Sequence, residues 1–285
     1  MEHQRGDPSP QNKTHVLRPC ERCETVYDAT TDVLLARFAS RAVAEAHLCF
    51  PCREVQLTSE QTSQKEQTAK RLKYWRGEWL RRAIPSNFAS ATLDAFDTGD
   101  GDNAKRLADI RSWTDSFPVD ASPKGYPSLL LVSPNNGVGK TYLACAILRS
   151  LIERFAQVGR ERLPYQFWTA GGIKRRMMDA QRFGGPETIS QVCQDFASMW
   201  LLVLDDMGKE KLGGAEVAAT YEAYYGIIND RYNAQLPMLI TSNLGLVPWQ
   251  PGGLSLGEII GQSGVSRLKE MANATQYHIE GEDRR

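Results

Sequence analysis

The sequence has no apolar run that approaches the roughly 20 residues needed to span a bilayer. Its first residues, MEHQRGDPSPQNK, lack the hydrophobic core of a secretory signal. A net charge is also missing, because 34 Lys and Arg residues balance 34 Asp and Glu residues. Any binding to nucleic acid therefore requires a local basic patch. These absences predict a cytoplasmic protein that has no membrane partner.

Cysteine is scarce as well, with six in 285 residues, and four of the six form two C-x-x-C pairs. In a reducing compartment, cysteines are more often metal ligands or core residues than disulfides. Each pair presents two thiolates on one tight turn, and two such turns complete a tetrahedral Zn²⁺ site. The alternatives are two redox motifs or accidental cysteines, and His47 is a possible substitute ligand. The prediction is a zinc site formed by Cys20, Cys23, Cys49 and Cys52.

Composition divides the chain into four parts. Residues 1–15 are polar and contain proline, which favours a disordered tail. Residues 16–57 form the zinc-binding module, a segment too small to fold without the metal, with a helix expected over Ala36–Leu48. Residues 58–83 are rich in Gln, Thr, Ser, Lys and Glu, which is typical of a linker or helix. Residues 84–285 are long enough for one sizeable domain.

The segment LLLVSPNNGVGKTYLA, residues 129–144, is the strongest motif in the chain. Four buried-type residues predict a central strand, and a glycine-containing turn then leads into a helix at Lys140. Such a turn directs backbone N–H groups and the helix dipole toward one point, where a polyphosphate can bind. The pattern G-x-x-x-x-G-K-[ST] is met except that Pro134 replaces the first Gly. The alternative is a chance glycine-rich turn. The predicted ATP-binding residues are Pro134, Asn135, Asn136, Gly137, Val138, Gly139, Lys140, Thr141 and Tyr142.

Two acids follow a second buried strand, WLLVLDD at residues 200–206. After a phosphate-binding loop, this pattern is typical of a nucleotidase. Asp205 would hold Mg²⁺ through water, the Thr141 hydroxyl would ligate the same ion, and Asp206 would orient or deprotonate the attacking water. Asn243 ends the next strand, where an amide can reach the γ-phosphate; the alternative is a simple strand-ending turn residue. Lys140, Asp206 and Asn243 are therefore catalytic candidates.

Strands and helices alternate along the second half of the chain. Strands are expected at 165–169, 200–206, 237–243 and 277–279, with helices at 102–117, 140–155, 171–183 and 217–232. This alternation predicts a parallel sheet with helices on both faces. The fold class is thus α/β, with a small zinc-binding domain at the amino-terminal side.

The segments GVGKTYLA, LLVLDDMG, INDRYNAQLPMLITSNL and VSRLKEM, in this order, resemble the DnaC/IstB family of AAA+ ATPases. The resemblance covers residues 84–285 and implies a P-loop AAA+ (ASCE) core. It also implies that Asn243 is sensor 1 and that Arg267 is an arginine finger acting on a neighbouring subunit, which requires self-association. Only residues 244–285 follow Asn243, about half of what a full helical lid needs.

The resemblance is greatest to helicase loaders of the DnaC and DnaI type. It implies an ATPase that uses ATP and Mg²⁺ to load a replicative DNA helicase, gripped by the zinc module, onto single-stranded DNA. An IstB-type transposition helper and a slowly hydrolysing nucleotide-dependent adaptor are the alternatives. Relatives place a DNA-contacting insertion where this chain has Lys174, Arg175 and Arg176, although a solvated helix face explains three basic residues equally well.

Overall fold

The computed structural model describes residues 17–29, 47–99, 102–158, 165–181, 187–208, 215–273 and 275–283. The chain divides into two compact units, residues 1–71 and 72–285. The tail expected over 1–15 lies outside the described residues. So does the helix expected over 36–48, apart from His47 and Leu48, which are not helical. Among the described helices, none is long and apolar enough to cross a membrane.

The first unit contains a small antiparallel hairpin formed by β1 (Leu17–Pro19) and β2 (Val26–Asp28). The first cysteine pair lies in the turn between these strands, and the second pair lies where α3 (Phe50–Ala83) begins. The segment expected as linker or helix, residues 58–83, is part of α3. Its Gln, Glu, Lys and Arg residues are good helix formers, which accounts for a helix here.

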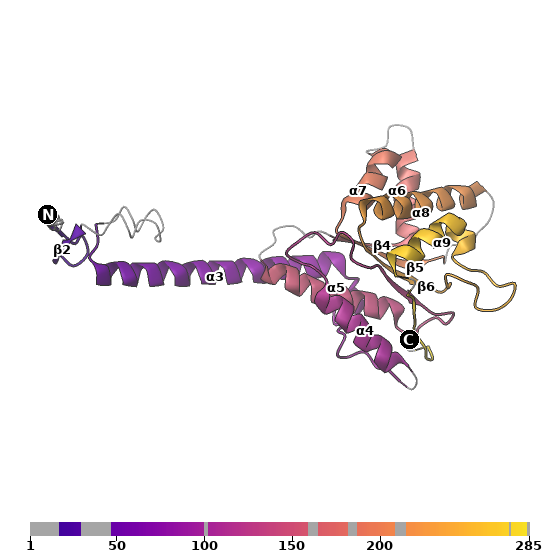
Figure 1. Ribbon diagram of the computed structural model, residues 1–285, viewed down its shortest axis with the longest axis horizontal. Coiled ribbons are helices and arrows are strands. Elements are labelled where there is room, and N and C mark those ends of the chain that lie inside the picture. Colours follow the sequence, from indigo (N-terminus) through magenta and orange to yellow (C-terminus); the bar gives the residue numbers. More distant parts are fainter. Residues whose placement is uncertain are drawn as a thin grey trace, which may run out of the picture. The chain divides into compact units, whose positions relative to one another are not determined.

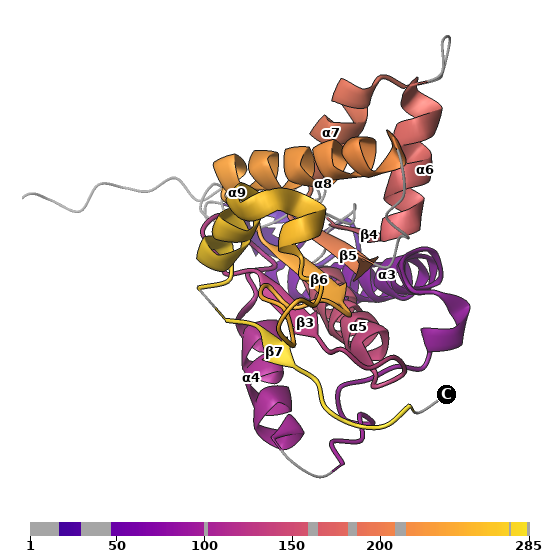
Figure 2. The same cartoon turned by 90° about the vertical axis from the view of Figure 1, so that its right-hand side faces the viewer.

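The second unit is built on a five-stranded parallel sheet with the order β4-β5-β6-β3-β7. The strand that precedes the phosphate-binding loop, β3, lies between β6 and β7, and β5 lies on the far side of β6 (Figure 2). The carboxyl ends of these strands therefore meet at one edge of the sheet. The strands are β3 (Leu129–Val132), β4 (Tyr165–Thr169), β5 (Leu201–Met207), β6 (Met238–Ser242) and β7 (Tyr277–His278).

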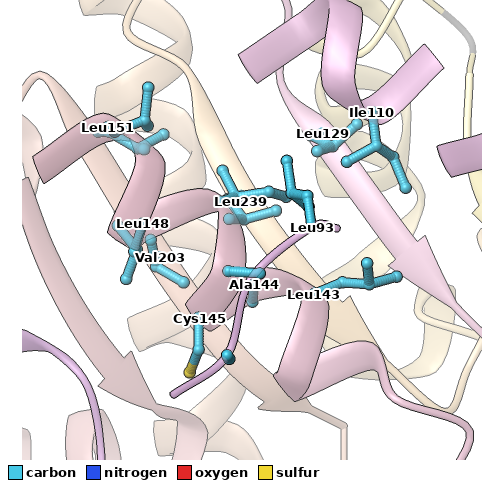
Figure 3. Close-up of a cluster of buried hydrophobic side chains, with 14 of the residues drawn as sticks. Leu93, Ile110, Leu129, Leu143, Ala144, Cys145, Leu148, Leu151, Val203 and Leu239 are labelled. Atoms are coloured by element: carbon cyan, nitrogen blue, oxygen red, sulfur yellow. The ribbon is translucent and has the colours of Figure 1, made fainter. Parts of the chain in front are cut away.

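Helices cover both faces of this sheet, as expected (Figure 1). Successive side chains of β3 alternate between the two layers: Leu129 and Leu131 pack with α4 and α5, whereas Leu130 packs with the helices of the other face. Figure 3 shows Leu129 of β3 beside Ile110 of α4, and Val203 of β5 beside Leu148 of α5. The first face carries α4 (Asn103–Ser116) and α5 (Lys140–Gln157); the second carries α6 (Ala170–Gln181), α7 (Ile189–Ser198), α8 (Ala215–Ala234) and α9 (Gly257–Met271).

The described residues that follow β6 form a loop, the helix α9 and the strand β7. These described residues contain no further helices that would make a full lid. The last residues pack beside the sheet: the backbone N of Ile279 donates to Val132 O at 2.8 Å, and Arg106 of α4 pairs with Glu280 at 3.0 Å. The chain end is thereby held near the edge at which β3 leads into α5.

Candidate functional site

The segment between β3 and α5 holds a lysine against its own backbone. The side chain of Lys140 is buried. Its Nζ donates hydrogen bonds to the carbonyl oxygens of Asn135, at 2.7 Å, and Ser133, at 3.4 Å. A positive charge therefore lies beside the amino-terminal end of α5. Both features favour an anion at this point.

Two glycines give this loop its shape. Gly137 has φ +71° and Gly139 has φ +100°, a region that favours glycine. The ring of Phe96 lies against Gly139, and a β-carbon there would come within 2.7 Å of the ring. Val138, between the glycines, is fully buried in the core and anchors the loop. The loop thus keeps its backbone exposed while one side chain fixes it to the domain.

The carboxylate of Asp205 is oriented by two hydroxyl groups. Its Oδ1 accepts hydrogen bonds from Thr141 Oγ1 at 2.9 Å and from Thr241 Oγ1 at 2.6 Å. Thr141 belongs to α5 and Thr241 to β6, so three elements meet at this carboxylate. Sequence reasoning named Asp205 and Thr141 but missed Thr241, because only the pairing of β5 with β6 brings that hydroxyl to the acid.

Asp206 lies at an irregularity of β5. The register of β5 with β6 shifts between Leu204 and Met207, and Asp206 has φ +58°. Its backbone N donates to Thr241 Oγ1 at 2.9 Å. Successive side chains of a regular strand point to opposite faces, but a bulge can redirect one of them. The consequence is that both Asp205 and Asp206 line the same cavity.

Asn243 follows β6 and faces the loop across the same edge. Its Nδ2 donates to Asn136 Oδ1 at 2.9 Å, and its carbonyl oxygen accepts a hydrogen bond from Trp249 Nε1 at 2.8 Å. The side-chain amide is thereby held over the loop. The hydrogen bond between Asn243 and Asn136 joins two of the residues that the sequence placed at the site, although they are 107 positions apart in the chain.

These residues surround a cavity of about 660 Å³, a size suited to a small-molecule ligand. Sequence reasoning missed one wall, which comes from residues 87–97 ahead of the sheet. The only sequence indication was that the family resemblance covers residues 84–285, which include this segment. Tyr142 joins this wall to the loop, since its hydroxyl accepts a hydrogen bond from Thr92 N at 3.3 Å. The lining residues are Asn87, Phe88, Ala95, Phe96, Asp97, Asn136, Gly137, Gly139, Lys140, Thr141, Tyr142, Asp205, Asp206 and Asn243.

The chemistry of this lining fits a magnesium nucleotide. The hydroxyl of Thr141 and the carboxylate of Asp205 supply the oxygen ligands that Mg²⁺ prefers, and they already lie 2.9 Å apart. Lys140 and the loop amides supply positive potential for phosphates. Aromatic residues on the opposite wall, Phe88 and Phe96, offer an apolar surface to a base. Pro134, Asn135 and Val138 belong to the loop but do not line the cavity.

The four cysteines of the first unit come together as the sequence predicted. Their sulfur atoms all lie within 4.8 Å of one another, and Cys23 Sγ is 3.5 Å from Cys49 Sγ. Tetrahedral Zn²⁺ with bonds of about 2.3 Å requires sulfur separations of roughly 3.8 Å. The cluster therefore can hold zinc. His47 is not part of this cluster. Its Nδ1 lies 3.3 Å from Arg18 Nη1.

The basic residues of α6 differ in their surroundings. Arg176 forms ion pairs with Glu187 and Asp195 and lies over the rings of Trp168 and Phe196. The hydrogen bonds that Arg176 donates to Glu187 are the main reason that the pKa of Arg176 is raised. This guanidinium joins α6 to Glu187, which precedes α7, and to Asp195 of α7. Arg175 is exposed and Lys174 is half-buried.

Arg267 lies on α9 and is not one of the residues that line the cavity. Its Nη1 donates to Ser263 O at 3.2 Å, within the same helix. The guanidinium carbon lies 5.3 Å from the ring centre of Tyr225 and 5.7 Å from that of Tyr232. The structure of one chain thus separates Arg267 from the other predicted catalytic residues.

Comparison with known families agrees with this geometry. Residues 92–254, more than half of the chain, match the family described as IstB-like ATP binding protein. The chain belongs to this family. The resemblance to DnaC/IstB proteins noted from the motifs is thereby confirmed, and ATP binding is the property that defines the IstB-like family by name. No curated protein matches the chain.

Solved structures show the same fold as this IstB-like chain. The crystal structure of "the DnaC helicase loader" matches with 24% identity and a TM-score of 0.50, covering 69% of this chain and 100% of that one. The crystal structure of "the DnaI" matches with 19% identity and a TM-score of 0.50, covering 71% of this chain and 94% of that one. At these identities the likeness concerns the fold, a P-loop AAA+ core, which confirms the predicted fold class.

Proposed function

We propose that this IstB-like protein binds and hydrolyses ATP in the cavity beside β3 and uses the cycle to load a replicative DNA helicase onto single-stranded DNA. The observation that carries the proposal is the convergence of Lys140, Thr141 and Asp205 on one cavity, with Thr141 Oγ1 2.9 Å from Asp205 Oδ1. A buried ammonium, an exposed loop backbone and an oriented carboxylate are the groups that a magnesium nucleotide needs.

The residues of the chain have distinct parts in this reaction. The loop amides of residues 135–139 and the ammonium of Lys140 hold the outer phosphates of ATP. Thr141 and Asp205 would hold Mg²⁺, which when bound offsets charge on the phosphate oxygens. Thr241 keeps the Asp205 carboxylate turned toward the cavity, because its hydroxyl donates to Oδ1.

Hydrolysis requires a water molecule positioned behind the γ-phosphate. Asp206 is directed into the cavity by the strand irregularity and is the group in our proposal that orients this water and accepts its proton. Asn243, held over the loop by Asn136, contacts the γ-phosphate or the attacking water. Neither residue requires large movement for these contacts, since both already line the cavity.

The site needs a further positive charge, and we assign this to Arg267 of a neighbouring copy. An arginine that approaches in trans offsets negative charge in the transition state of phosphoryl transfer. Within its own chain, Arg267 does not line the cavity. Self-association that places α9 of one copy beside the cavity of the next would supply it.

Two features support a loader among the IstB-like possibilities. The solved structures with the same fold carry the titles of the DnaC helicase loader and of DnaI. The chain also has a separate compact unit that contains a zinc-compatible cluster, which gives it a module for gripping a partner. In this proposal the module binds the helicase, and Lys174 and Arg175 of α6 contact the DNA backbone.

A direct test is affinity capture with the full chain in the presence of ATP, followed by mass spectrometry. The matched control carries Cys20→Ser and Cys49→Ser, which remove two ligands of the cluster. We expect a replicative helicase with the native chain and its loss with the cysteine variant. A transposase in its place would contradict the loader and support the transposition helper, which the family match also favours. Turnover measured with the captured partner then separates a hydrolysing ATPase from a nucleotide-sensing adaptor.

A further inference from the structure

Two tyrosines of α8 contact the guanidinium of Arg267. The guanidinium carbon lies 5.3 Å from the ring centre of Tyr225 and 5.7 Å from that of Tyr232. These tyrosines are seven residues apart on one helix face, so their α-carbons are separated by roughly 10.5 Å along the helix axis. A single guanidinium reaches both rings because they lie along the same face of α8. The guanidinium therefore lies over a face of each ring.

Each of the two rings is itself held by a neighbour. The hydroxyl of Tyr232 donates to Glu270 Oε2 at 2.8 Å, and this hydrogen bond raises the pKa of Tyr232. Glu270 is one helical turn beyond Arg267 on α9. Tyr232 thus packs against Arg267 while its hydroxyl is fixed by the same helix.

Tyr225 is supported from the other side by a second tyrosine. The rings of Tyr221 and Tyr225 are parallel, 6° apart, with centres separated by 6.0 Å. Tyr221 lies against Gly261, where α9 is kinked with φ +68°, and a β-carbon at that position would come within 2.4 Å of the Tyr221 hydroxyl. The kink therefore makes room for Tyr221, and Tyr221 supports the ring that contacts Arg267.

The Arg267 side chain makes few hydrogen bonds where it contacts these rings. Its Nη1 donates to Ser263 O at 3.2 Å, and its buried Nε has no hydrogen-bond partner among the described residues. Arg231, on the same helix as the tyrosines, is the contrast. It is fully buried and donates to the carbonyl oxygens of Phe196, Met199, Trp200 and Pro237. The Nε of Arg231 also has no partner among the described residues, but both of its Nη atoms donate, whereas Arg267 donates one hydrogen bond, from Nη1, and contacts two rings.

Rings are suited to this role for a physical reason. A guanidinium stacked on an aromatic face is restrained in orientation while the N–H groups at its edge remain able to bind phosphate. An ion pair would hold the same arginine but would offset its charge. The aromatic contacts thus keep the charge of Arg267 while limiting its movement.

We propose that Tyr225 and Tyr232 are positioning residues that hold the guanidinium of Arg267 ready to contact the phosphates of a nucleotide bound by a neighbouring copy of the chain. This inference rests on the proposed function, in which Arg267 acts in trans. The two tyrosines touch neither nucleotide nor reacting atoms. They limit the orientations that the Arg267 side chain can adopt before two copies of the chain associate.

The test compares variants that remove a ring with variants that keep it. Tyr225→Leu and Tyr232→Leu remove the aromatic face, and Tyr225→Phe and Tyr232→Phe retain it. We expect each Leu variant to lower ATP hydrolysis by the assembled protein about five- to tenfold, the size of one lost cation–π contact. ATP affinity, measured on the dilute chain, should stay unchanged. Each Phe variant should hydrolyse ATP within about twofold of the native chain.

The same variants in an Arg267→Ala background separate positioning from packing. We expect no further loss there, because the rings then have nothing to position. Leu variants that equal the native chain, Phe variants that lose as much as Leu variants, or an equal loss in the Arg267→Ala background would each overturn the inference. If the Leu variants fail to fold by circular dichroism, Glu270→Gln serves instead. It should lower hydrolysis about twofold only in chains that carry Arg267.

Failure of this inference is distinguishable from failure of the proposed function. If Arg267→Ala alone hydrolyses ATP as the native chain does, the trans arginine is wrong and the positioning role falls with it. If Arg267→Ala loses activity while the Leu variants keep theirs, the trans arginine stands and only the role of the tyrosines is overturned.

Discussion

Lys140 is buried beside the loop carbonyl oxygens of Asn135 and Ser133, so its charge is concentrated where phosphates would enter. We expect Lys140→Ala to weaken ATP binding by at least a hundredfold, since a hydrogen bond to a charged group in a buried site contributes about 1.5–3 kcal/mol and the lost long-range attraction adds to it. Fluorescent-nucleotide titration measures this. Lys124→Ala, at an exposed turn, is the matched control. Equal affinity in both variants would contradict the role of Lys140.

Asp206 supplies a second test at a single position. Its φ of +58° lies in a region that Asn tolerates as well as Asp, so Asp206→Asn preserves the backbone while removing the charge. We expect ATP binding to persist and hydrolysis to fall about a hundredfold or more, as for loss of a general base. Phosphate release in single-turnover reactions measures the change, with Asp115→Asn on exposed α4 as control. Unchanged turnover would remove Asp206 from catalysis.

Single residues show where sequence reasoning succeeds and where it stops. Lys140 and Thr141 were predictable because the phosphate-binding pattern is contiguous. Thr241 and Phe96 were not, since the hydroxyl reaches Asp205 through strand pairing and the ring reaches Gly139 through folding of the lead-in. The sequence did not distinguish Arg176 from its basic neighbours, but in the structure Arg176 forms ion pairs with Glu187 and Asp195.

At the scale of elements, most strands and helices of the second unit were predictable within about two residues. The exceptions are α7 (Ile189–Ser198) and α9 (Gly257–Met271), which the sequence analysis missed. The start of α7 is marked by a local capping box, in which Thr188 and Gln191 exchange hydrogen bonds. The order of strands in the sheet was beyond reach, because pairing joins segments as far apart as β3 and β7.

The amino-terminal cysteine cluster gives a prediction at this scale. We expect one zinc ion per chain by metal analysis of the purified protein, because four sulfur atoms within 4.8 Å suit a tetrahedral ion. Cys20→Ser with Cys49→Ser should abolish zinc binding, whereas Cys193→Ser, outside the cluster, should keep it. ATP affinity should not change, since the residues that line the cavity all lie in the second unit. A native protein without zinc would exclude the metal.

For the whole molecule, a balanced net charge means that DNA binding must come from a local surface. We expect Lys174→Ala with Arg175→Ala to weaken single-stranded DNA binding at low salt. The slope of log affinity against log salt should fall by about 1.4, or roughly 0.7 for each lost phosphate contact. Lys105→Ala, at an exposed position of α4, is the control. An unchanged salt slope in the double variant would place the DNA contacts elsewhere.

The central claim concerns an ATP site completed by a second copy of the chain. Within one chain, Arg267 lies over the rings of Tyr225 and Tyr232 and does not line the cavity. Arg267→Ala should therefore leave ATP affinity of the dilute chain nearly intact. It should lower hydrolysis by roughly a thousandfold or more if the usual contribution of such an arginine applies.

The most direct measurement mixes two inactive proteins, Arg267→Ala and Lys140→Ala, and follows ATP hydrolysis. The first keeps an intact nucleotide site and the second keeps the arginine, so an interface between them contains both. We predict that hydrolysis returns on mixing, rises with the fraction of mixed interfaces and is absent from either protein alone. A mixture that co-assembles yet stays as inactive as its parts would contradict a nucleotide site shared between neighbouring copies.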